Sequence, residues 1–336
     1  MQFKKISELR AGMRLARPIY NKNGVLLFDR DSKITEQGIS NIQNFGLFGL
    51  FILEPAEPCP PMSPEDIEFE RFQTVNVFSL MDEINKINIQ GKSIKFQVIV
   101  SNIIKSYGHL ENKINFNQNL RSEEDYRYKH ALNVGILCAM MCNKLNLKLE
   151  ERVDVVSAAL IRGNTTLDTI ERVFSSDPNV KRYINQAQHL EECAEKGVME
   201  GNMKIMDGGK ILAVATVFDN MTAMRVESTP ESEVATIRYM LDKPGIFDKR
   251  VVMALVESIN VLVPGVCVEL STGSKALVLS ENKIDMFRPM VLSFNNNEIM
   301  DLANRMSYGD VEIIDIMKTM DNRHVIDTEM LKSFGM

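Results

Sequence analysis

A single histidine, His130, lies at the centre of the stretch of sequence that has the residue types for chemistry. It falls on one face of a predicted helix with apolar residues, because Val134, Leu137 and Met141 follow at helical spacing. An imidazole can ligate a metal or act as an acid or base near neutral pH. A lone histidine among apolar neighbours is more often a hydrogen-bonded core residue, so His130 by itself predicts a buried polar position and no particular reaction.

Other residues that could take part lie in two later segments. Arg162 and Gly163 follow an apolar helix, and Thr216 and Asp219 belong to a core helix whose apolar residues recur at i, i+3 and i+4. Thr216 and Asp219 are three residues apart, so both side chains could approach His130. An aspartate in such a position more often makes a structural hydrogen bond or ion pair than a metal contact.

The composition indicates a globular protein of two or three domains. The chain has 336 residues, of which 45% are hydrophobic and 25% charged, so it can bury an ordinary core. Its net charge of −6 argues against nucleic acid or an anionic membrane as the main partner. No apolar run approaches the roughly 20 residues that span a bilayer, and the five cysteines lack zinc-type spacing. We therefore expect a cytoplasmic protein in a reducing compartment, without membrane insertion.

Changes of pattern along the sequence divide it into four parts. Short β-type runs around the turn signal NKNG predict a small module, and five prolines in ten positions predict a linker. Helical periodicity follows until about residue 262, after which alternating runs such as VCVELS and KALVLS predict strands. The predicted parts are 1–54 (β-rich module), 55–64 (proline-rich linker), 65–262 (helical domain) and 263–336 (small β appendage and mixed C-terminal tail).

Local signals place several helices within the third part. A helix is expected to begin after Ser63, which precedes Pro64 and two acidic residues. A second helix is expected from about 93 to 107, and the apolar segment 153–161 predicts a short buried helix. The glycines of the later loops do not form a phosphate-binding pattern.

Three segments of the helical domain resemble motifs of HD-GYP domains, bacterial relatives of cyclic di-GMP phosphodiesterases. HALNVG at 130–135 is similar to the family pattern HSxxVA, and AALIRGNTT at 158–166 lines up with AALLHDIGK. KILAVATVFDNMTAMR at 210–225 is similar to RILAVADVFDALTSxR and is the most specific of the three. The resemblance covers most of residues 1–295. It implies a mainly α fold, with an HD-type helical bundle core between the two β-rich parts.

The resemblance also implies a catalytic site whose ligands are mostly replaced in this chain. Family members hydrolyse a phosphodiester with two or three clustered metal ions, usually iron or manganese, held by imidazoles and carboxylates. His130 matches the first histidine ligand. The metal-binding HD pair is Arg162-Gly163, and the aspartate of the VAD motif is Thr216. The carboxylate of three-metal members falls at Tyr126. His130 is therefore a vestigial ligand, and no catalytic residue, metal or other cofactor is expected.

These replacements predict a degenerate, non-catalytic protein. We expect a scaffold or regulatory interaction module of cyclic di-GMP-type signalling, whose partner is another signalling protein. Similarity to the family suggests a homodimer. The region around His130 is expected to hold packed side chains, with Arg162 paired to a nearby carboxylate.

Two alternatives follow from the same residues. In the first, the protein is a nucleotide sensor in which Arg162 and Arg225 donate to the phosphate groups of cyclic di-GMP. In the second, it is a residual metal-dependent phosphodiesterase with unrecognised ligands. The candidates for those ligands are His189, Asp219, His109 and Asp207.

Overall fold

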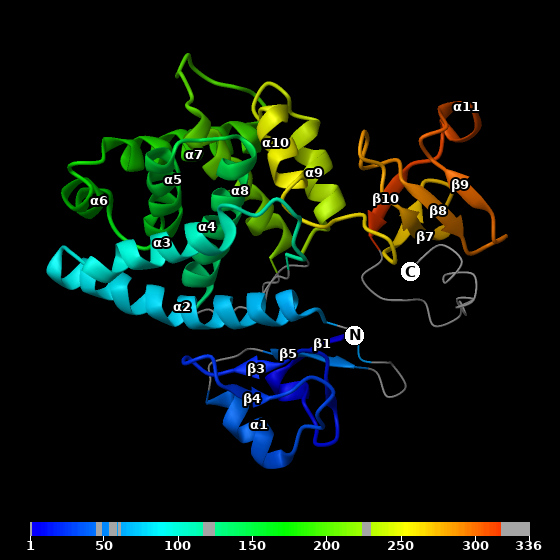
Figure 1. Cartoon of the computed structure of the whole chain (residues 1–336), viewed down its shortest axis with the longest axis horizontal. Helices are drawn as coiled ribbons and strands as arrows, with labels where there is room; N and C mark the ends of the chain where they lie inside the picture. The colour runs from blue at the N-terminus through cyan, green and yellow to red at the C-terminus, as the bar shows by residue number, and fades with distance from the viewer. Residues whose placement is uncertain are drawn as a thin grey trace. The chain divides into compact units, whose positions relative to one another are not determined.

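The computed structural model describes residues 2–44, 49–53, 59, 62–116, 125–223 and 230–316. Its contacts divide the chain into two compact units, Met1–Pro230 with Tyr239–Ile259, and Glu231–Arg238 with Asn260–Met336. The chain is mostly helical with small β-sheets toward both ends, as the sequence predicted (Figure 1). Among the described helices, none combines the length and the apolar character needed to cross a bilayer.

The first residues form a small β-rich module. β1 (Gln2–Lys5) and β2 (Arg14–Leu15) flank β5 (Gly49–Leu53) in an antiparallel sheet. β3 (Ile19–Tyr20) and β4 (Leu26–Phe28) pair across the expected turn. α1 (Glu36–Gln43) begins at Thr35, whose hydroxyl accepts a hydrogen bond from the Gly38 N–H. Buried aliphatic side chains from the sheet, the loops and the helix form the core of the module: Leu9, Leu15, Ile34, Ile42, Leu50 and Ile52.

The first two long helices begin where the sequence predicted. α2 (Pro64–Gln90) starts at Ser63, whose hydroxyl accepts from the Asp66 N–H while the Asp66 carboxylate accepts from the Ser63 N–H. α3 (Ile94–Tyr107) starts at Ser93, whose hydroxyl accepts from the Phe96 N–H. The two helices contact each other on one side of the larger unit (Figure 1).

α4 (Tyr126–Lys144) is the central helix of the larger unit. All residues from 131 to 142 are buried, because α2, α3, α5 (Leu149–Ile161), α8 (Asp207–Thr222) and α10 (Lys249–Val256) contact it. α7 (Pro178–Lys196) contacts α5, α8 and the short α6 (Leu167–Val173). His130 lies near the N-terminal end of α4, where the burial is incomplete.

α5 is longer than its apolar pattern indicated. The sequence predicted a helix over 153–161, whereas the helix begins at Leu149. Its first turn contains Glu150 and Glu151, which interact favourably with the positive end of the helix dipole. The acidic residues therefore stabilise a first turn that the pattern of apolar residues does not predict.

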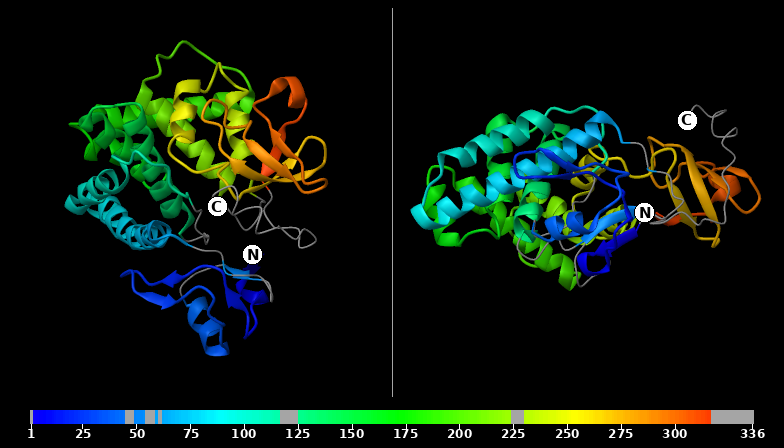
Figure 2. Two further views of the ribbon diagram at one scale, coloured as in Figure 1. Left: turned by 45° about the vertical axis from the view of Figure 1, so that its right-hand side comes forward. Right: turned by 90° about the horizontal axis from the view of Figure 1, so that it is seen from below.

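The second unit is built on an antiparallel sheet of order β10-β6-β7-β8-β9, drawn mainly in orange in Figure 2. β6 (Cys267–Leu270), β7 (Lys275–Ser280) and β8 (Met290–Ser293) are the strands that the alternating runs predicted. β9 (Ile299–Asp301), α11 (Arg305–Tyr308) and β10 (Ile313–Ile316) lie in the segment that the sequence indicated only as a mixed tail. The first part of α9 (Glu233–Leu241) belongs to this unit, and its Arg238 donates to the carbonyl of Ile313.

Candidate functional site

His130 and Asp219 form the centre of the candidate site. Nδ1 of His130, on α4, lies 2.6 Å from Oδ2 of Asp219, on α8. The Asp219 side chain is fully buried, whereas the His130 side chain is 21% exposed. An ionised carboxylate can only accept a hydrogen bond, so Nδ1 of His130 is the donor to an ionised Asp219. The other ring nitrogen, Nε2, takes no part in this contact.

Two buried amides extend this pair into a network that joins three helices. Nδ2 of Asn133 donates to Oδ1 of Asp219 at 3.0 Å. Nε2 of Gln73, on α2, donates to Oδ1 of Asn133 at 2.9 Å. Asn133 is fully buried and Gln73 is 2% exposed, so their hydrogen bond satisfies polar groups that are costly to bury. The network holds Asp219 through Oδ1, the oxygen that does not contact His130.

Tyr126 covers His130 on α4. The two rings are nearly parallel, with an interplanar angle of 12° and centroids 6.2 Å apart. The Tyr126 hydroxyl donates to Oδ1 of Asn220 at 3.4 Å. An aromatic ring therefore stands at the position where the resemblance places the carboxylate of three-metal family members.

Arg162 makes an ion pair at the C-terminal end of α5. Its two terminal nitrogens donate to the two carboxylate oxygens of Glu191, on α7, at 2.6 and 2.7 Å. Nη1 also lies 3.4 Å from Oγ1 of Thr216, on α8. The expectation that Arg162 is paired with a nearby carboxylate is confirmed. Bidentate bonds of this kind are among the strongest that a guanidinium makes.

α8 places the two groups of polar residues next to each other. Thr216 and Asp219 are one helical turn apart, and Thr216 contacts Arg162 while Asp219 contacts His130. Of the two residues that the sequence suggested near His130, Asp219 makes the contact and Thr216 bonds to the arginine. The polar cluster of His130, Asp219, Arg162, Glu191 and Thr216 thus uses side chains from four helices.

The backbone at Gly163 has a conformation that suits glycine. Gly163 follows the C-cap of α5 and has a φ of 71°, a conformation that residues with a Cβ atom rarely adopt. A side chain at this position would start from a less favourable backbone conformation.

The other candidate ligands have their own contacts elsewhere. Nε2 of His189 lies 2.9 Å from the carbonyl oxygen of Glu200, and the residue is half-buried on α7. Asp207 accepts from Arg250 at 2.7 Å, and His109 is exposed after α3. Arg225 lies outside the described residues.

Sequence reasoning missed three members of the site. Asn133 follows His130 by three residues, so helical spacing alone places it on the same side of α4. Gln73 and Glu191 come from α2 and α7, and no local pattern relates either of them to His130 or Arg162. Only the packing of the helices brings them together.

These donors do not fit the metal cluster that the resemblance implies. Iron or manganese in such a cluster needs several imidazoles and carboxylates that are free to coordinate. Here the Asp219 carboxylate is bonded to His130 and Asn133, and the Arg162 cation is paired with Glu191 where the resemblance would place the HD pair. In the parts of the chain that the structure describes, no group of three or more histidine, cysteine, aspartate and glutamate residues could hold a metal ion. The site presents one imidazole nitrogen beside an internally paired cation.

Comparisons of the chain with family models, curated proteins and solved structures found no match.

Proposed function

We propose that this chain is a non-catalytic relative of HD-GYP domains, acting as a scaffold or regulatory module in cyclic di-GMP-type signalling. Its partner would be another signalling protein. The observation that carries the proposal is the ion pair of Arg162 with Glu191, because it stands where the resemblance places the metal-binding HD pair.

The charge pattern explains how such a fold could persist without a metal. A metal cluster brings positive charge that draws ligand side chains from several helices together. The Arg162 guanidinium also brings positive charge, and it contacts Glu191 of α7 and Thr216 of α8 from the end of α5. The helices are thus held together at the same place by a cation that belongs to the chain.

The state of His130 agrees with a structural role. Its Nδ1 is bonded to a fully buried carboxylate, and Tyr126 lies parallel to its ring. A single imidazole nitrogen can contribute to a metal site but cannot hold a catalytic metal pair alone. We therefore assign His130 to the stability of the contact between α4 and α8.

The sensor alternative is less favoured by the geometry. Both terminal nitrogens of Arg162 already donate to Glu191, so a phosphate would have to compete with this carboxylate for the positive charge of the guanidinium. Calorimetric titration of the full-length chain with cyclic di-GMP tests this alternative. We expect no binding heat and no shift in melting temperature.

Metal analysis combined with an activity assay tests the proposed function. The purified full-length chain would be analysed for iron and manganese, then assayed with cyclic di-GMP with and without added Mn²⁺. We expect no stoichiometric metal and no hydrolysis. Stoichiometric metal with turnover that is lost in Asp219→Ala would overturn the proposal. Glu171→Ala is the control, because Glu171 is 66% exposed and pairs with Lys181 at the surface.

A further inference from the structure

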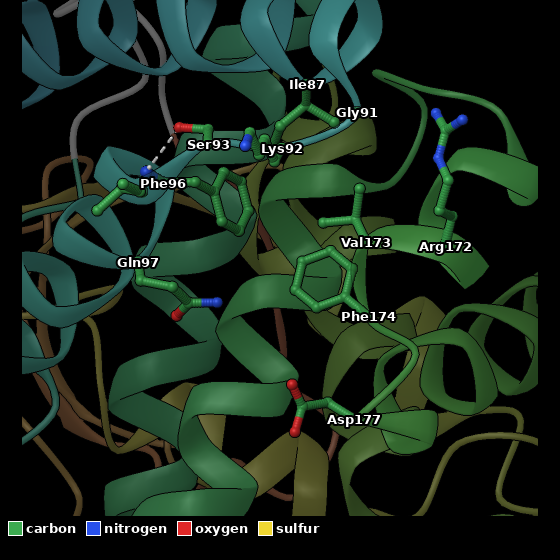
Figure 3. Close-up of a pocket in the computed structure, with 11 residues that line it drawn as sticks. Ile87, Gly91, Lys92, Ser93, Phe96, Gln97, Arg172, Val173, Phe174 and Asp177 are labelled. Carbon is green, nitrogen blue, oxygen red and sulfur yellow. Dashed lines mark hydrogen bonds between the residues drawn. The ribbon is translucent and has the colours of Figure 1, made fainter.

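The turn between α2 and α3 contains a pocket of about 340 Å³ that is separate from the polar cluster around His130. Figure 3 shows its lining residues, which come from the end of α2, the start of α3, the end of α6 and the segment after it. Those used below are Lys92, Ser93, Ile94, Phe96, Arg172 and Phe174.

The floor of the pocket is apolar and firmly held. The rings of Phe96 and Phe174 meet edge to face, with centroids 5.9 Å apart, and both side chains are buried. Phe96 is further fixed through its backbone, whose N–H donates to the Ser93 hydroxyl, as the dashed line in Figure 3 marks. Ser93 in turn bonds to the carboxylate of Glu83 on α2. The turn therefore has a defined shape.

Large aliphatic side chains stand in solvent beside this floor. Ile94 is 88% exposed and lines the pocket, and Val98, one turn further along α3, is 52% exposed. Ile89, in the last turn of α2, is 83% exposed. Single exposed aliphatic residues are normal, whereas three within ten residues around a pocket are typical of an interaction surface.

The charge around the pocket is opposite in sign to that of the whole chain. The chain has a net charge of −6. Lys92, Lys95 and Arg172, however, are close to the pocket and have no ion-pair partner among the residues that the structure describes. The one acidic residue in the lining, Asp177, lies at the far side in Figure 3 and accepts from the Ser176 hydroxyl. The turn therefore presents a local excess of positive charge.

Arg172 lies close to the end of α2. A Cβ atom at Gly91 would lie 3.2 Å from Nη2 of Arg172, so the absence of a side chain at Gly91 lets the guanidinium approach closely. Gly91 has a φ of 72° and ends the helix, where the dipole favours a nearby cation. The positive charge of Arg172 thus lies near the negative end of the helix dipole.

We propose that this surface, formed by Ile89, Lys92, Ile94, Val98 and Arg172, docks an acidic segment of a partner protein that carries an apolar anchor. The anchor would lie over the Phe96–Phe174 floor, and carboxylates on either side would face the unpaired cations. The exposed aliphatic residues extend beyond the pocket, so a protein segment covers them better than a small molecule does. This inference rests on the proposed function as an interaction module and assigns it a surface and a partner class.

A designed pair of peptides tests the inference. The probe is a fluorescein-labelled amphipathic peptide with leucines at i, i+3, i+4 and i+7 and glutamates elsewhere. Its matched control has lysine in place of each glutamate. Fluorescence anisotropy with the full-length chain is expected to show saturable binding of the acidic peptide only. The affinity is expected to fall as the salt concentration rises from about 50 to about 300 mM.

Variants locate the binding to this surface. Ile94→Glu and Lys92→Glu are each expected to weaken acidic-peptide binding by about tenfold or more. Ile284→Glu is the matched control, because Ile284 is 95% exposed and lies in the second unit. Circular dichroism checks that each variant folds. Failure of the acidic peptide to bind, equal binding of the basic peptide, or binding unaffected by Ile94→Glu would overturn the proposal.

Light scattering on the same variants excludes a different occupant. A change of oligomeric state in Ile94→Glu would mean that a second copy of this chain covers the surface, and would also overturn the proposal. The tests of the two proposals are distinguishable. Stoichiometric metal together with hydrolysis of cyclic di-GMP would refute only the non-catalytic assignment. Failure of the acidic peptide to bind to a protein that contains no metal would refute only the docking surface.

Discussion

The imidazole of His130 is held against the buried carboxylate of Asp219, and this bond of 2.6 Å connects α4 to α8 at the centre of the larger unit. The second oxygen of Asp219 accepts a hydrogen bond from Asn133, so the carboxylate bonds to two side chains of α4. The resemblance to a catalytic family directs attention to His130, yet the more deeply buried residue is the aspartate. Its replacement should have the larger effect on stability.

Asp219→Asn is expected to lower the free energy of unfolding by about 2–4 kcal/mol, because an amide cannot accept from both His130 and Asn133 in the same way. Urea unfolding followed by circular dichroism measures the change. Glu171→Gln is the control, since Glu171 is 66% exposed and pairs with Lys181 at the surface. Its effect should stay within about 0.5 kcal/mol. Additive effects of His130→Ala and Asp219→Ala would contradict a direct coupling of the two side chains.

Gly208→Ala is expected to destabilise the contact between α7 and α8. A Cβ atom at Gly208 would lie 2.6–2.8 Å from ring atoms of the buried Tyr183. Cβ atoms in real structures essentially never have contacts this short. Overpacking of this kind costs about 1–3 kcal/mol. Thermal unfolding measures the loss. Gly245→Ala is the matched control, because a Cβ there meets nothing within 4 Å, and a comparable loss in both variants would contradict the packing explanation.

Asp248 should contribute an acid-sensitive part of the stability. A hydrogen bond from Lys210 at 2.8 Å lowers the pKa of Asp248 below its ordinary value of 3.8, and the Arg250 N–H acts in the same direction. The folded state therefore holds this proton less tightly than the unfolded state does. The stabilisation is present above about pH 3.8 and is lost as the pH falls through the folded-state pKa.

Urea unfolding at several pH values from 7 to about 3 tests this expectation against Asp248→Asn. The variant should be less stable than the parent at pH 7, and the difference should shrink below pH 4. A difference that is constant over this range would show that the carboxylate charge is not involved. Lys210→Met should give the same loss of pH dependence, because it removes the first cause of the shift.

The cysteines of α4 should resist alkylation in the folded protein. Burial raises the pKa of Cys142 to about 12 and that of Cys138 well above its ordinary value, and thiolates are the reactive form. Iodoacetamide at pH 8, followed by peptide mass mapping, should label the partly exposed Cys59 before either of them. In denaturant all three should react. Equal labelling in the folded state would mean that α4 is far less protected than its burial indicates.

The sequence located those features that depend on neighbouring residues. Ser63 was predicted as a helix start because a capping hydroxyl acts within three residues of its own position. The helix expected from about residue 93 also begins directly after a capping serine, Ser93. The turn between β3 and β4 was predicted for a similar reason. The predicted start of α5 was wrong, because the first turn of this helix contains acidic residues that the apolar pattern does not include. β9 and β10 were not separated from the tail. β9 is short, and β10 pairs with β6, which is distant in sequence.

The candidate site shows the same division. Arg162 could be expected to find a carboxylate, but Glu191 as its partner depends on how α7 packs against α5. Likewise Asp219 was a candidate neighbour of His130. Gln73 was not, because it precedes Asn133, to which it donates, by 60 residues and lies on another helix. Side chains that meet across a helical bundle leave no periodic signal in the sequence.

Because both charges of the Arg162–Glu191 pair belong to the chain, the contribution of this pair to the contact between α5 and α7 does not depend on the supply of a bound metal. A bound metal stabilises a fold by mass action, so its contribution rises and falls with supply. An internal ion pair has no such linkage. We therefore expect the melting temperature to be the same in chelator and in added manganese, which would keep the protein assembled under metal starvation.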